Sequence, residues 1–543
     1  MNSLDISRRF NWALHWLTGS LLVLFSLTLL SISAAQAGQE TEPLVSTASG
    51  TLQGFMSGDV EVFLGVPFAQ PPVGELRWRE PQPLKSWEGI RTALEYGPAC
   101  PQPANLLFAD AGESSEDCLY LNIWTAGHSQ RRQPVIVYLH GGAFIYGSGS
   151  QQAYDGAALA ARGIVVVTLN YRLGALGFLA HPELSAQSPT HTSGNYGLLD
   201  QLAALRWVRD NISAFGGDPG NVTLMGESAG AVSVCTLMSS PLSSGLFQQA
   251  VVMSGGAPGR LRNLSSQRNG LASMESLGED WAAQRMQRLG LHDFSELRQV
   301  PWQSLQGAGI AGIGPRDIDI VDMMSMDGTI CIDGYLLQDS PAEIFRSGKQ
   351  LPVPVMCGSL RNEGAMFTLG MRFRNMQQYE GVLERIFGPR LDIATELYPA
   401  ADTNMALAQL STFISDGFGA GVRNVARSTD SAGNAAWLYR FDYVNPLARL
   451  TGIGTFHGSE VPYFFGSFPV PAAYGRGSEL LSSRLGDYLE SFARTGNPNG
   501  SDNLEWPAYD QSQEALLQIN LPMSRGAVER TRQFDLISES GLW

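Results

Sequence analysis

The chain has 543 residues, of which 44% are hydrophobic and 16% are charged, and it contains 60 Gly and 29 Pro. This balance is typical of a globular protein and excludes a disordered or fibrous chain. The 36 Lys and Arg residues are outnumbered by 51 Asp and Glu residues, which gives a net charge of −15. Because no basic run interrupts the chain beyond its N-terminal segment, we expect no nucleic-acid partner.

The N-terminal segment has the pattern of a secretory signal. A pair of Arg residues precedes the apolar run 21–32, and small residues follow as far as Ala37. This order predicts a signal peptide over 1–37, with cleavage after Ala37. An uncleaved membrane anchor is the alternative interpretation. No second apolar run of about 18 residues follows, so we expect the mature chain 38–543 to be secreted or periplasmic, with no stable membrane span.

The five cysteines agree with export to an oxidising compartment. Cys100 and Cys118 lie in a loop-like stretch rich in Pro, Ala, Gly and Ser, where a disulfide between them is expected. Cys235, Cys331 and Cys357 lie inside apolar segments and are expected to be buried free thiols. None of them has metal-ligand spacing with a His, so we expect no metal site.

The apolar pattern changes along the chain. Short strands bounded by Gly and Pro are expected first, at 60–66 and 119–124. Continuous apolar runs then alternate with helical segments, which predicts βαβ units and a large, mostly parallel sheet with helices on both faces. The expected buried strands are 135–139, 164–169, 222–225, 249–253, 354–358 and 436–442, and the expected helices include 157–162, 198–213 and one that begins at Ala229.

The segment 255–339 shows no strand periodicity. We expect it to form helices and loops inserted over the carboxyl edge of the sheet. No internal repeat divides the chain, so one domain over 38–543 with insertions is expected.

The sharpest local motif is Gly-Glu-Ser-Ala-Gly at 226–230, between an expected strand and an expected helix. Small residues two positions before and after Ser228 allow a tight turn that exposes its hydroxyl. The helix that follows offers backbone N–H groups to a developing oxyanion. The motif therefore predicts a nucleophilic serine, although a structural Gly-Ser turn is the simpler alternative.

A nucleophilic serine needs a base, and the histidines can be eliminated in turn. In hydrolases with this strand–turn–helix, the serine is followed along the chain by the acid and then by the histidine. Of the seven histidines, His292 and His457 follow Ser228. Too little core strand precedes His292 to supply the acid, whereas His457 lies in a loop after the expected strand 436–442. His457 is the predicted general base.

The acid is expected at the end of a strand between these two residues. Glu363 follows the strand 354–358 within a few residues, so we predict that it orients the imidazole of His457. The competing carboxylates do not follow a comparable apolar strand; they are Asp322, Asp327, Asp333 and Asp416.

A second glycine-containing loop, His-Gly-Gly-Ala-Phe at 140–144, follows the strand 135–139. Glycines placed after a buried strand allow backbone N–H groups to point at a ligand oxygen, as in the oxyanion loops of esterases and lipases. The N–H of Ala229 would complete the set of donors. His140 itself is expected to be structural.

These residues together resemble the type-B carboxylesterase family, which includes cholinesterases and fungal lipases. Residues 215–223, running into 226–230, resemble its nucleophile signature, and Ser-Glu-Asp-Cys-Leu-Tyr-Leu-Asn at 115–122 resembles its second signature. The similarity covers nearly the whole mature chain. It extends to residues 170–172, 177–179, 195–197, 200–201 and 497–499.

The resemblance implies an α/β-hydrolase fold and assigns roles to individual residues. It implies Ser228, Glu363 and His457 as the catalytic residues, and Cys100–Cys118 as the family's first disulfide. The remaining residues that it implies are the oxyanion donors Gly142, Ala143 and Ala229 and the supporting residues Ser254 and Glu460.

Two departures from the family pattern bear on specificity. The loop between Cys100 and Cys118 contains Leu106, Leu107 and Phe108 but no Trp, so the choline-binding aromatic feature of cholinesterases is missing. The family's usual second disulfide, in the middle of the chain, has no evident pair of cysteines in this sequence.

The sequence therefore predicts a secreted serine carboxylesterase that acts on a small-molecule substrate, a neutral ester of moderate size, through an acyl-enzyme, without metal or organic cofactor. We expect an apolar pocket lined by Phe144 and Ile145. Two alternatives stay open: a lipase acting on long-chain acylglycerols, and a cholinesterase-like adhesion protein without catalytic activity.

Overall fold

A sheet of 11 strands organises the chain in the computed structural model. The structure describes residues 42–104, 112–127, 132–305, 328–500 and 502–543. The predicted signal peptide, the loop residues Leu106, Leu107 and Phe108, and the carboxylates Asp322 and Asp327 lie outside these ranges. Residues Leu44–Trp543 form one compact unit.

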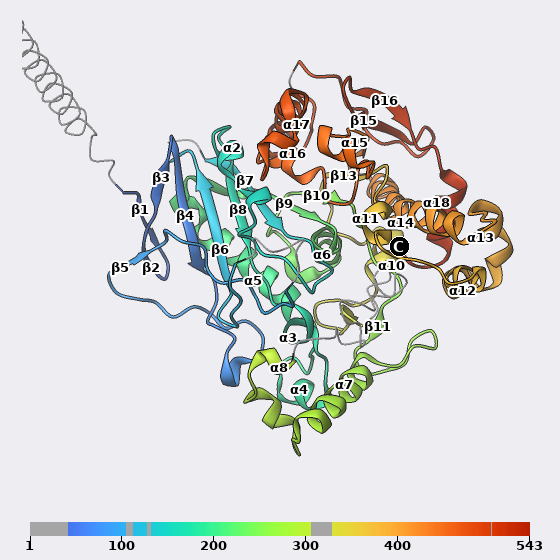
Figure 1. The fold of residues 1–543 in the computed structure, drawn as a ribbon. Helices are drawn as coiled ribbons and strands as arrows, with labels where there is room; N and C mark the ends of the chain where they lie inside the picture. The colour runs from blue at the N-terminus through green and yellow to red at the C-terminus, as the bar shows by residue number, and fades with distance from the viewer. Residues whose placement is uncertain (1–41, 105–111, 128–131, 306–327, 501) are drawn as a thin grey trace, which may run out of the picture. The chain divides into compact units, whose positions relative to one another are not determined.

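The large sheet has the order β16-β15-β14-β13-β10-β9-β7-β8-β6-β4-β3 (Figure 1). Its seven central strands, from β15 to β8, are parallel, and the strands outside them at both edges are antiparallel. The strand bounds are β3 Phe55–Ser57, β4 Val60–Pro67, β6 Tyr120–Thr125, β7 Gln133–Leu139, β8 Val165–Leu169, β9 Gly217–Glu227, β10 Gln249–Met253, β13 Val355–Leu360, β14 Ala436–Phe441, β15 Ala515–Ile519 and β16 Ser524–Ala527. The mostly parallel sheet predicted from the apolar runs is confirmed.

Both faces of this sheet are buried, which explains the continuous apolar runs in its strands. In β7, Val135, Val137 and Leu139 enter one core, and Ile136 and Tyr138 enter the other. Helices α5, α6 and α14 contribute to the first core, and α16 and α17, which lie together in Figure 1, contribute to the second. The sheet is therefore the middle layer of three.

Sixteen α-helices are described in these ranges. Their bounds are α2 Ala157–Ala160, α3 Gly174–Phe178, α4 Pro182–Gln187, α5 Tyr196–Asn211, α6 Ala229–Met238, α7 Met274–Leu289, α8 Trp302–Leu305, α10 Pro341–Arg346, α11 Gly364–Thr368, α12 Met376–Phe387, α13 Leu391–Leu397, α14 Thr403–Ser431, α15 Pro446–Thr451, α16 Val461–Phe465, α17 Gly475–Thr495 and α18 Thr531–Glu539. None of the described helices is both long enough and apolar enough to cross a bilayer.

Two small sheets lie outside the large one. The N-terminal sheet joins β1 (Leu44–Thr47), β2 (Gly50–Gln53) and β5 (Ile90–Thr92). The other pairs β11 (Arg262–Asn263) with β12 (Cys331–Ile332), inside the segment that was expected to hold only helices and loops. That segment also contains α7 and a 3₁₀ helix whose Phe294 ring stacks on His181, with centroids 3.8 Å apart.

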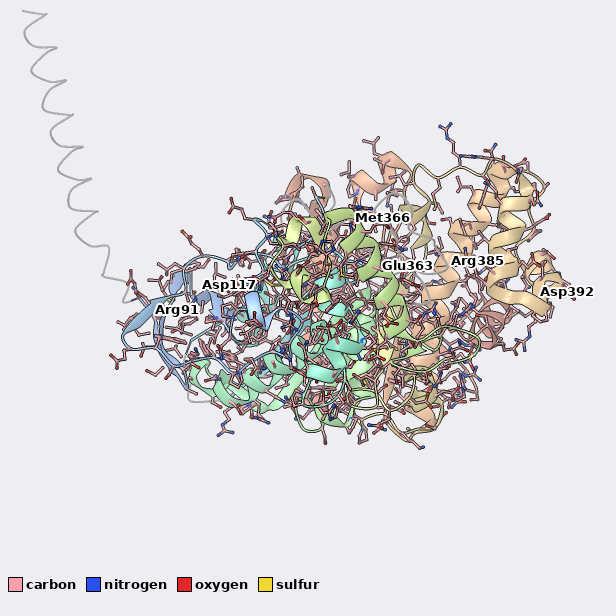
Figure 2. The ribbon with its side chains drawn as sticks, turned by 90° about the horizontal axis from the view of Figure 1, so that it is seen from below. Arg91, Asp117, Glu363, Met366, Arg385 and Asp392 are labelled. Atoms are coloured by element: carbon pink, nitrogen blue, oxygen red, sulfur yellow. A yellow bond between two sulfur atoms is a disulfide. The ribbon has the colours of Figure 1, made fainter. Side chains whose placement is uncertain are left out.

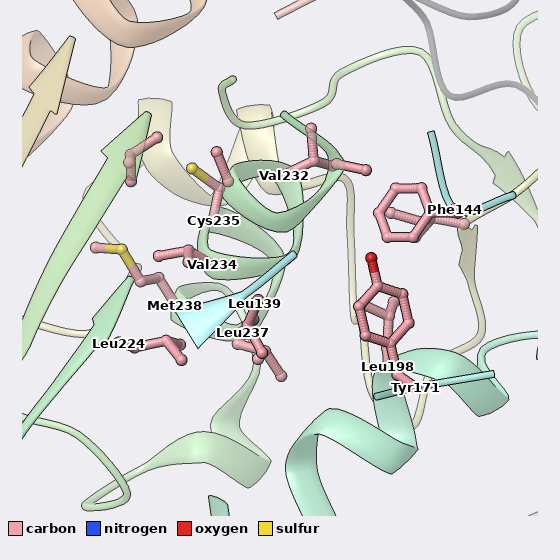
Figure 3. Close-up of a cluster of buried hydrophobic side chains, with 14 of the residues drawn as sticks. Leu139, Phe144, Tyr171, Leu198, Leu224, Val232, Val234, Cys235, Leu237 and Met238 are labelled. Atoms are coloured by element: carbon pink, nitrogen blue, oxygen red, sulfur yellow. The ribbon is translucent and has the colours of Figure 1, made fainter. Parts of the chain in front are cut away.

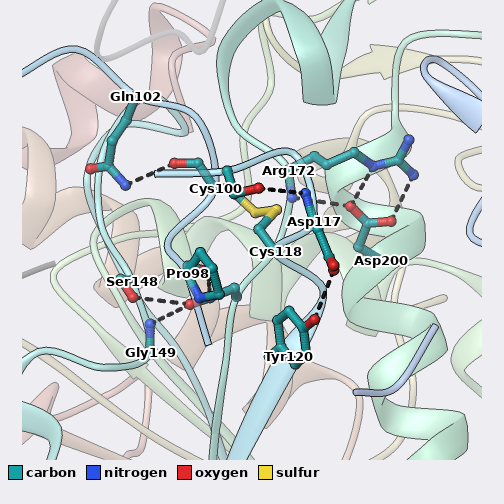
Figure 4. Close-up of a disulfide and its surroundings, with 12 residues drawn as sticks. Pro98, Cys100, Gln102, Asp117, Cys118, Tyr120, Ser148, Gly149, Arg172 and Asp200 are labelled. Carbon is teal, nitrogen blue, oxygen red and sulfur yellow. Dashed lines mark hydrogen bonds and ion pairs between the residues drawn. A yellow bond between two sulfur atoms is a disulfide. The ribbon is translucent and has the colours of Figure 1, made fainter. Parts of the chain in front are cut away.

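Cys100 and Cys118 form a disulfide, which confirms the predicted pair (Figure 4). The buried pair Arg172–Asp200 lies in the same surroundings, where Arg172 Nη2 donates to Asp200 Oδ1 at 2.7 Å. The remaining cysteines, Cys235, Cys331 and Cys357, are buried and free, as predicted.

We expect the double variant C100A/C118A to lower the free energy of unfolding in urea by roughly 3 kcal/mol, because the cross-link restricts the unfolded chain over a loop of this size. Dithiothreitol serves as the matched control. It should lower the stability of the wild type and leave that of the double variant unchanged. A wild type insensitive to the reductant would contradict the prediction.

Candidate active site

Ser228 lies at the turn between β9 and α6 with φ 56° and ψ −123°. A residue with a side chain rarely adopts this conformation, so the surrounding structure must hold it. The Ser228 N–H donates to the Met253 carbonyl of β10 at 2.9 Å. The serine is therefore attached to the neighbouring strand at the carboxyl end of the sheet.

Glycines on both sides of Ser228 are required by close backbone packing. A Cβ on Gly230 would lie 2.0 Å from the Leu139 carbonyl oxygen, and one on Gly226 would lie 2.4 Å from the Gly230 oxygen. Neither site has room for a side chain. Every residue of helix α6 is buried, and its side chains, such as Val232 and Leu237, lie in the same core as Leu139 of β7 (Figure 3). This packing gives the turn a rigid support.

The loop after β7 lies against the serine. A Cβ on Gly141 would be 3.0 Å from Ser228 Cβ. Gly142 has φ 110° and Ala143 has φ 54°. Among the described residues, no acceptor is hydrogen-bonded to the N–H of Gly142, Ala143 or Ala229. Three free donors beside one hydroxyl are suited to binding an anionic oxygen.

Glu363 and His457 meet in the interior. Glu363, which Figure 2 labels, follows β13. Its side chain is fully buried, and His457 Nδ1 lies 2.6 Å from Glu363 Oε2. A carboxylate accepts hydrogen bonds, so Nδ1 carries the proton and Nε2 is free to accept one. The Leu360 N–H also donates to Glu363 Oε1 at 2.8 Å, which fixes the carboxylate.

Two further residues surround the carboxylate of Glu363. Ser254 Oγ lies 2.7 Å from Glu363 Oε1 and 3.1 Å from Glu460 Oε1. A serine hydroxyl has one proton and donates to one oxygen at a time. Burial, followed by the charges of Glu227 and Glu363, raises the pKa of Glu460 well above 4.5, which favours the protonated form of this carboxyl group.

Glu227, directly before the serine, lies at the other side of the imidazole. Its Oε1 is 3.3 Å from His457 Nε2, so this nitrogen faces the turn that carries Ser228. Burial raises the pKa of Glu227 from 4.5 to about 7; His457 opposes this shift and Glu363 adds to it. Burial alone lowers the pKa of His457, but Glu227 and the hydrogen bond to Glu363 outweigh burial and raise it above 6.5.

Two phenyl rings contact the imidazole. Phe418 of α14 stacks on His457 with centroids 4.6 Å apart and planes at 29°, and Phe367 of α11 lies at 4.9 Å and 54°. These rings restrict the imidazole and exclude water from its faces.

The competing residues are engaged elsewhere. Asp333 accepts hydrogen bonds from the backbone of a turn at Tyr335 and from Asn195, and Asp416 binds Arg530 and Tyr398. Their geometry is that of structural carboxylates.

Two further predictions concern residues other than Ser228, Glu363 and His457. His292 is exposed, unlike the buried His457. The expectation that Phe144 lines a substrate pocket is wrong, because its ring is fully buried against Phe178 and Tyr171, with centroids 5.1 and 6.3 Å away.

Sequence reasoning missed Glu227, Phe367 and Phe418 as neighbours of the imidazole. Glu227 carried a usable signal, since it adjoins the proposed nucleophile. Phe418 carried none, because it lies in the middle of the long helix α14, whose position depends on tertiary packing.

A central sheet carrying a serine turn, an acid after β13 and a histidine after β14 defines the α/β-hydrolase fold, and known proteins agree. The structure of a PNB esterase matches 92% of this chain and 99% of its own, with a TM-score of 0.79 and 32% identity. The fumonisin B1 esterase of Sphingopyxis macrogoltabida is 37% identical over 507 residues, covering 91% of this chain and 89% of that protein. The para-nitrobenzyl esterase of Bacillus subtilis is 33% identical over 489 residues, covering 88% and 95%.

The family model described as "Carboxylesterase family" matches residues 41–536. The chain therefore belongs to the carboxylesterase family and is a carboxylic ester hydrolase. The relatives named here are esterases, which favours an enzyme over the alternative of a non-catalytic adhesion protein.

We expect Glu227→Gln to move the acid limb of the kcat/KM profile to lower pH, because the charge that raises the pKa of His457 is removed. Stability changes as well. Folded Glu227 keeps its proton between pH 4.5 and about 7, where the unfolded chain has lost it, so the wild type loses stability as pH rises through this window. E227Q should lack that loss.

Steady-state kinetics and urea unfolding from pH 5 to 9 test both expectations. The exposed Glu384 of α12 provides the matched control, because E384Q removes one carboxylate that is exposed to solvent. An acid limb that stays in place, or moves to higher pH, would show that Glu227 does not act on the imidazole.

Proposed function

We propose that Ser228 is the nucleophile of this ester hydrolase, with His457 as the general base and Glu363 as the acid that orients it. The supporting observation is the 2.6 Å contact between His457 Nδ1 and the buried Glu363, which leaves Nε2 directed at the serine turn. The short contact fixes the tautomer, because a carboxylate at Nδ1 requires the proton there.

The reaction has two steps. In the first, Ser228 Oγ forms a bond to the ester carbonyl carbon and its proton passes to His457 Nε2; the imidazolium then protonates the departing alcohol. In the second, water gives a proton to His457 and attacks the acyl-serine, and the proton returns to Ser228 as the carboxylic acid leaves. Glu363 and Glu227 stabilise the imidazolium in both steps.

The oxyanion of each tetrahedral intermediate is assigned to the N–H groups of Gly142, Ala143 and Ala229. All three donors belong to the backbone and are free of other acceptors among the described residues. Removing one preorganised donor of this kind lowers kcat by about 10²–10³-fold.

The substrate is proposed to be a neutral ester of moderate size. Phe367 and Phe418 place aromatic surface beside the reacting nitrogen, which favours apolar groups near the scissile bond. Two relatives are named as esterases of fumonisin B1 and of para-nitrobenzyl esters, which supports ester hydrolysis without fixing the substrate of this chain.

We expect S228A to lower kcat for a chromogenic short-chain ester by about 10⁴-fold or more, and E363Q to lower it severely too. A fluorophosphonate probe should label Ser228 in the wild type, as mass spectrometry of the labelled peptide can show. The exposed Ser46 is the matched control, and S46A should keep full activity. Labelling at a different serine would overturn the assignment of the nucleophile. If D416N lost kcat and E363Q kept it, the acid would be Asp416 and not Glu363.

The mature enzyme is proposed to begin after Ala37 and to be exported. The apolar N-terminal run, the Cys100–Cys118 disulfide and a family match that starts at residue 41 support this interpretation. N-terminal sequencing of the protein recovered outside the cytoplasm should read Gly-Gln-Glu-Thr, starting at Gly38. An intact N-terminus beginning at Met1 in a membrane fraction would instead indicate an uncleaved anchor.

A further inference from the structure

The side chain of His140 contacts the peptide group that joins Gly141 to Gly142. Its Nδ1 lies 2.8 Å from the Gly141 carbonyl oxygen, and its ring is fully buried and stacked on Tyr171, with centroids 4.3 Å apart and planes at 15°. We propose that His140 is a positioning residue, whose Nδ1–H holds the Gly141 carbonyl and thereby aims the Gly142 N–H at the oxyanion. The inference rests on the proposed catalytic role of this loop.

Because the peptide group is planar, a hydrogen bond to the Gly141 carbonyl also orients the Gly142 N–H. In a trans peptide the C=O and the N–H point in opposite directions, so fixing the Gly141 oxygen also fixes the Gly142 N–H. A peptide between two glycines has no side chains to restrict it, and Gly142 at φ 110° lies in a region open to glycine. The hydrogen bond from His140 supplies the missing restraint.

The tautomer of His140 follows from its neighbours. A carbonyl oxygen only accepts, so the ring proton must lie on Nδ1. Burial lowers the pKa of His140 to about 4, so the ring is neutral at the pH of catalysis. Among the described residues Nε2 has no hydrogen-bond partner, and as a bare acceptor it leaves no buried N–H unpaired. The opposite tautomer would leave one.

The contact is enclosed from the other side by Gly147. A Cβ there would lie 2.3 Å from His140 Nδ1 and 2.6 Å from the Gly141 oxygen. Gln102 holds Gly147 with two hydrogen bonds: the Gly147 N–H donates to Gln102 Oε1 at 2.9 Å, and Gln102 Nε2 donates to the Gly147 carbonyl at 2.8 Å. Gln102 Nε2 also contacts the Cys100 carbonyl at 3.1 Å (Figure 4), so the disulfide loop supports this arrangement.

The test compares H140N with H140L. The amide nitrogen of an asparagine occupies the place of Nδ1, whereas leucine has the same branching and no donor, and both lose the stacking on Tyr171. We expect kcat of H140L to fall about 10-fold to 100-fold below that of H140N, with KM changed by less than about threefold. The affinity for a trifluoromethyl ketone, whose serine adduct carries an oxyanion, should fall in parallel with kcat/KM.

H140F guards against a folding defect in H140L, because its ring keeps the volume and the stacking on Tyr171 but has no donor. It should show the same loss of kcat at a wild-type melting temperature. Equal kcat values for H140N and the two donor-free variants would overturn the positioning role. So would a loss of kcat that follows thermal stability and leaves ketone affinity unchanged.

A different result would refute the proposed function itself. A wild type that hydrolyses no ester and takes no fluorophosphonate at Ser228 would refute the catalytic assignment and the role of His140 with it. An active, labelled wild type combined with an unchanged H140L refutes the role of His140 alone.

Discussion

The structure of the site depends on the hydrogen bond between the buried Glu363 carboxylate and His457. A charge in the interior is costly unless it is paired and hydrogen-bonded. Here the imidazole, the Leu360 N–H and Ser254 all reach Glu363. Glu363 follows β13 and His457 follows β14, and these two strands are neighbours in the sheet, which brings the two side chains together.

Three buried carboxyl groups surround this one imidazole, and their surroundings differ. Glu363 accepts three hydrogen bonds, from His457, Leu360 and Ser254. Glu460 shares the Ser254 hydroxyl, and burial raises its pKa well above 4.5. Burial also raises the pKa of Glu227, to about 7. Glu227 and Glu363 therefore favour a positive imidazole at His457, which is the state that the proposed proton transfer from Ser228 would produce.

Much of this arrangement could be predicted from sequence. The apolar runs indicated the parallel sheet, and the motif at 226–230 indicated the turn, since a residue at φ 56° between two close backbone contacts needs glycine neighbours. His457 followed from chain order. Ser254 and Glu460 came only from family resemblance, because a lone polar residue carries no local pattern. The bond between His140 and its neighbouring carbonyl depends on distances within one loop, which no periodicity encodes.

The donors assigned to the oxyanion are main-chain atoms, and this has a consequence for how the sequence can vary. No substitution can delete a backbone N–H other than one to proline, so a mutation acts on these groups only by shifting them. The shape of the proposed anion site therefore depends on Gly226, Gly230 and Gly147, where the neighbouring atoms leave no room for a side chain. We expect substitutions in this family to be tolerated around the site and to be rare at these three glycines, where a single added methyl group would displace the backbone.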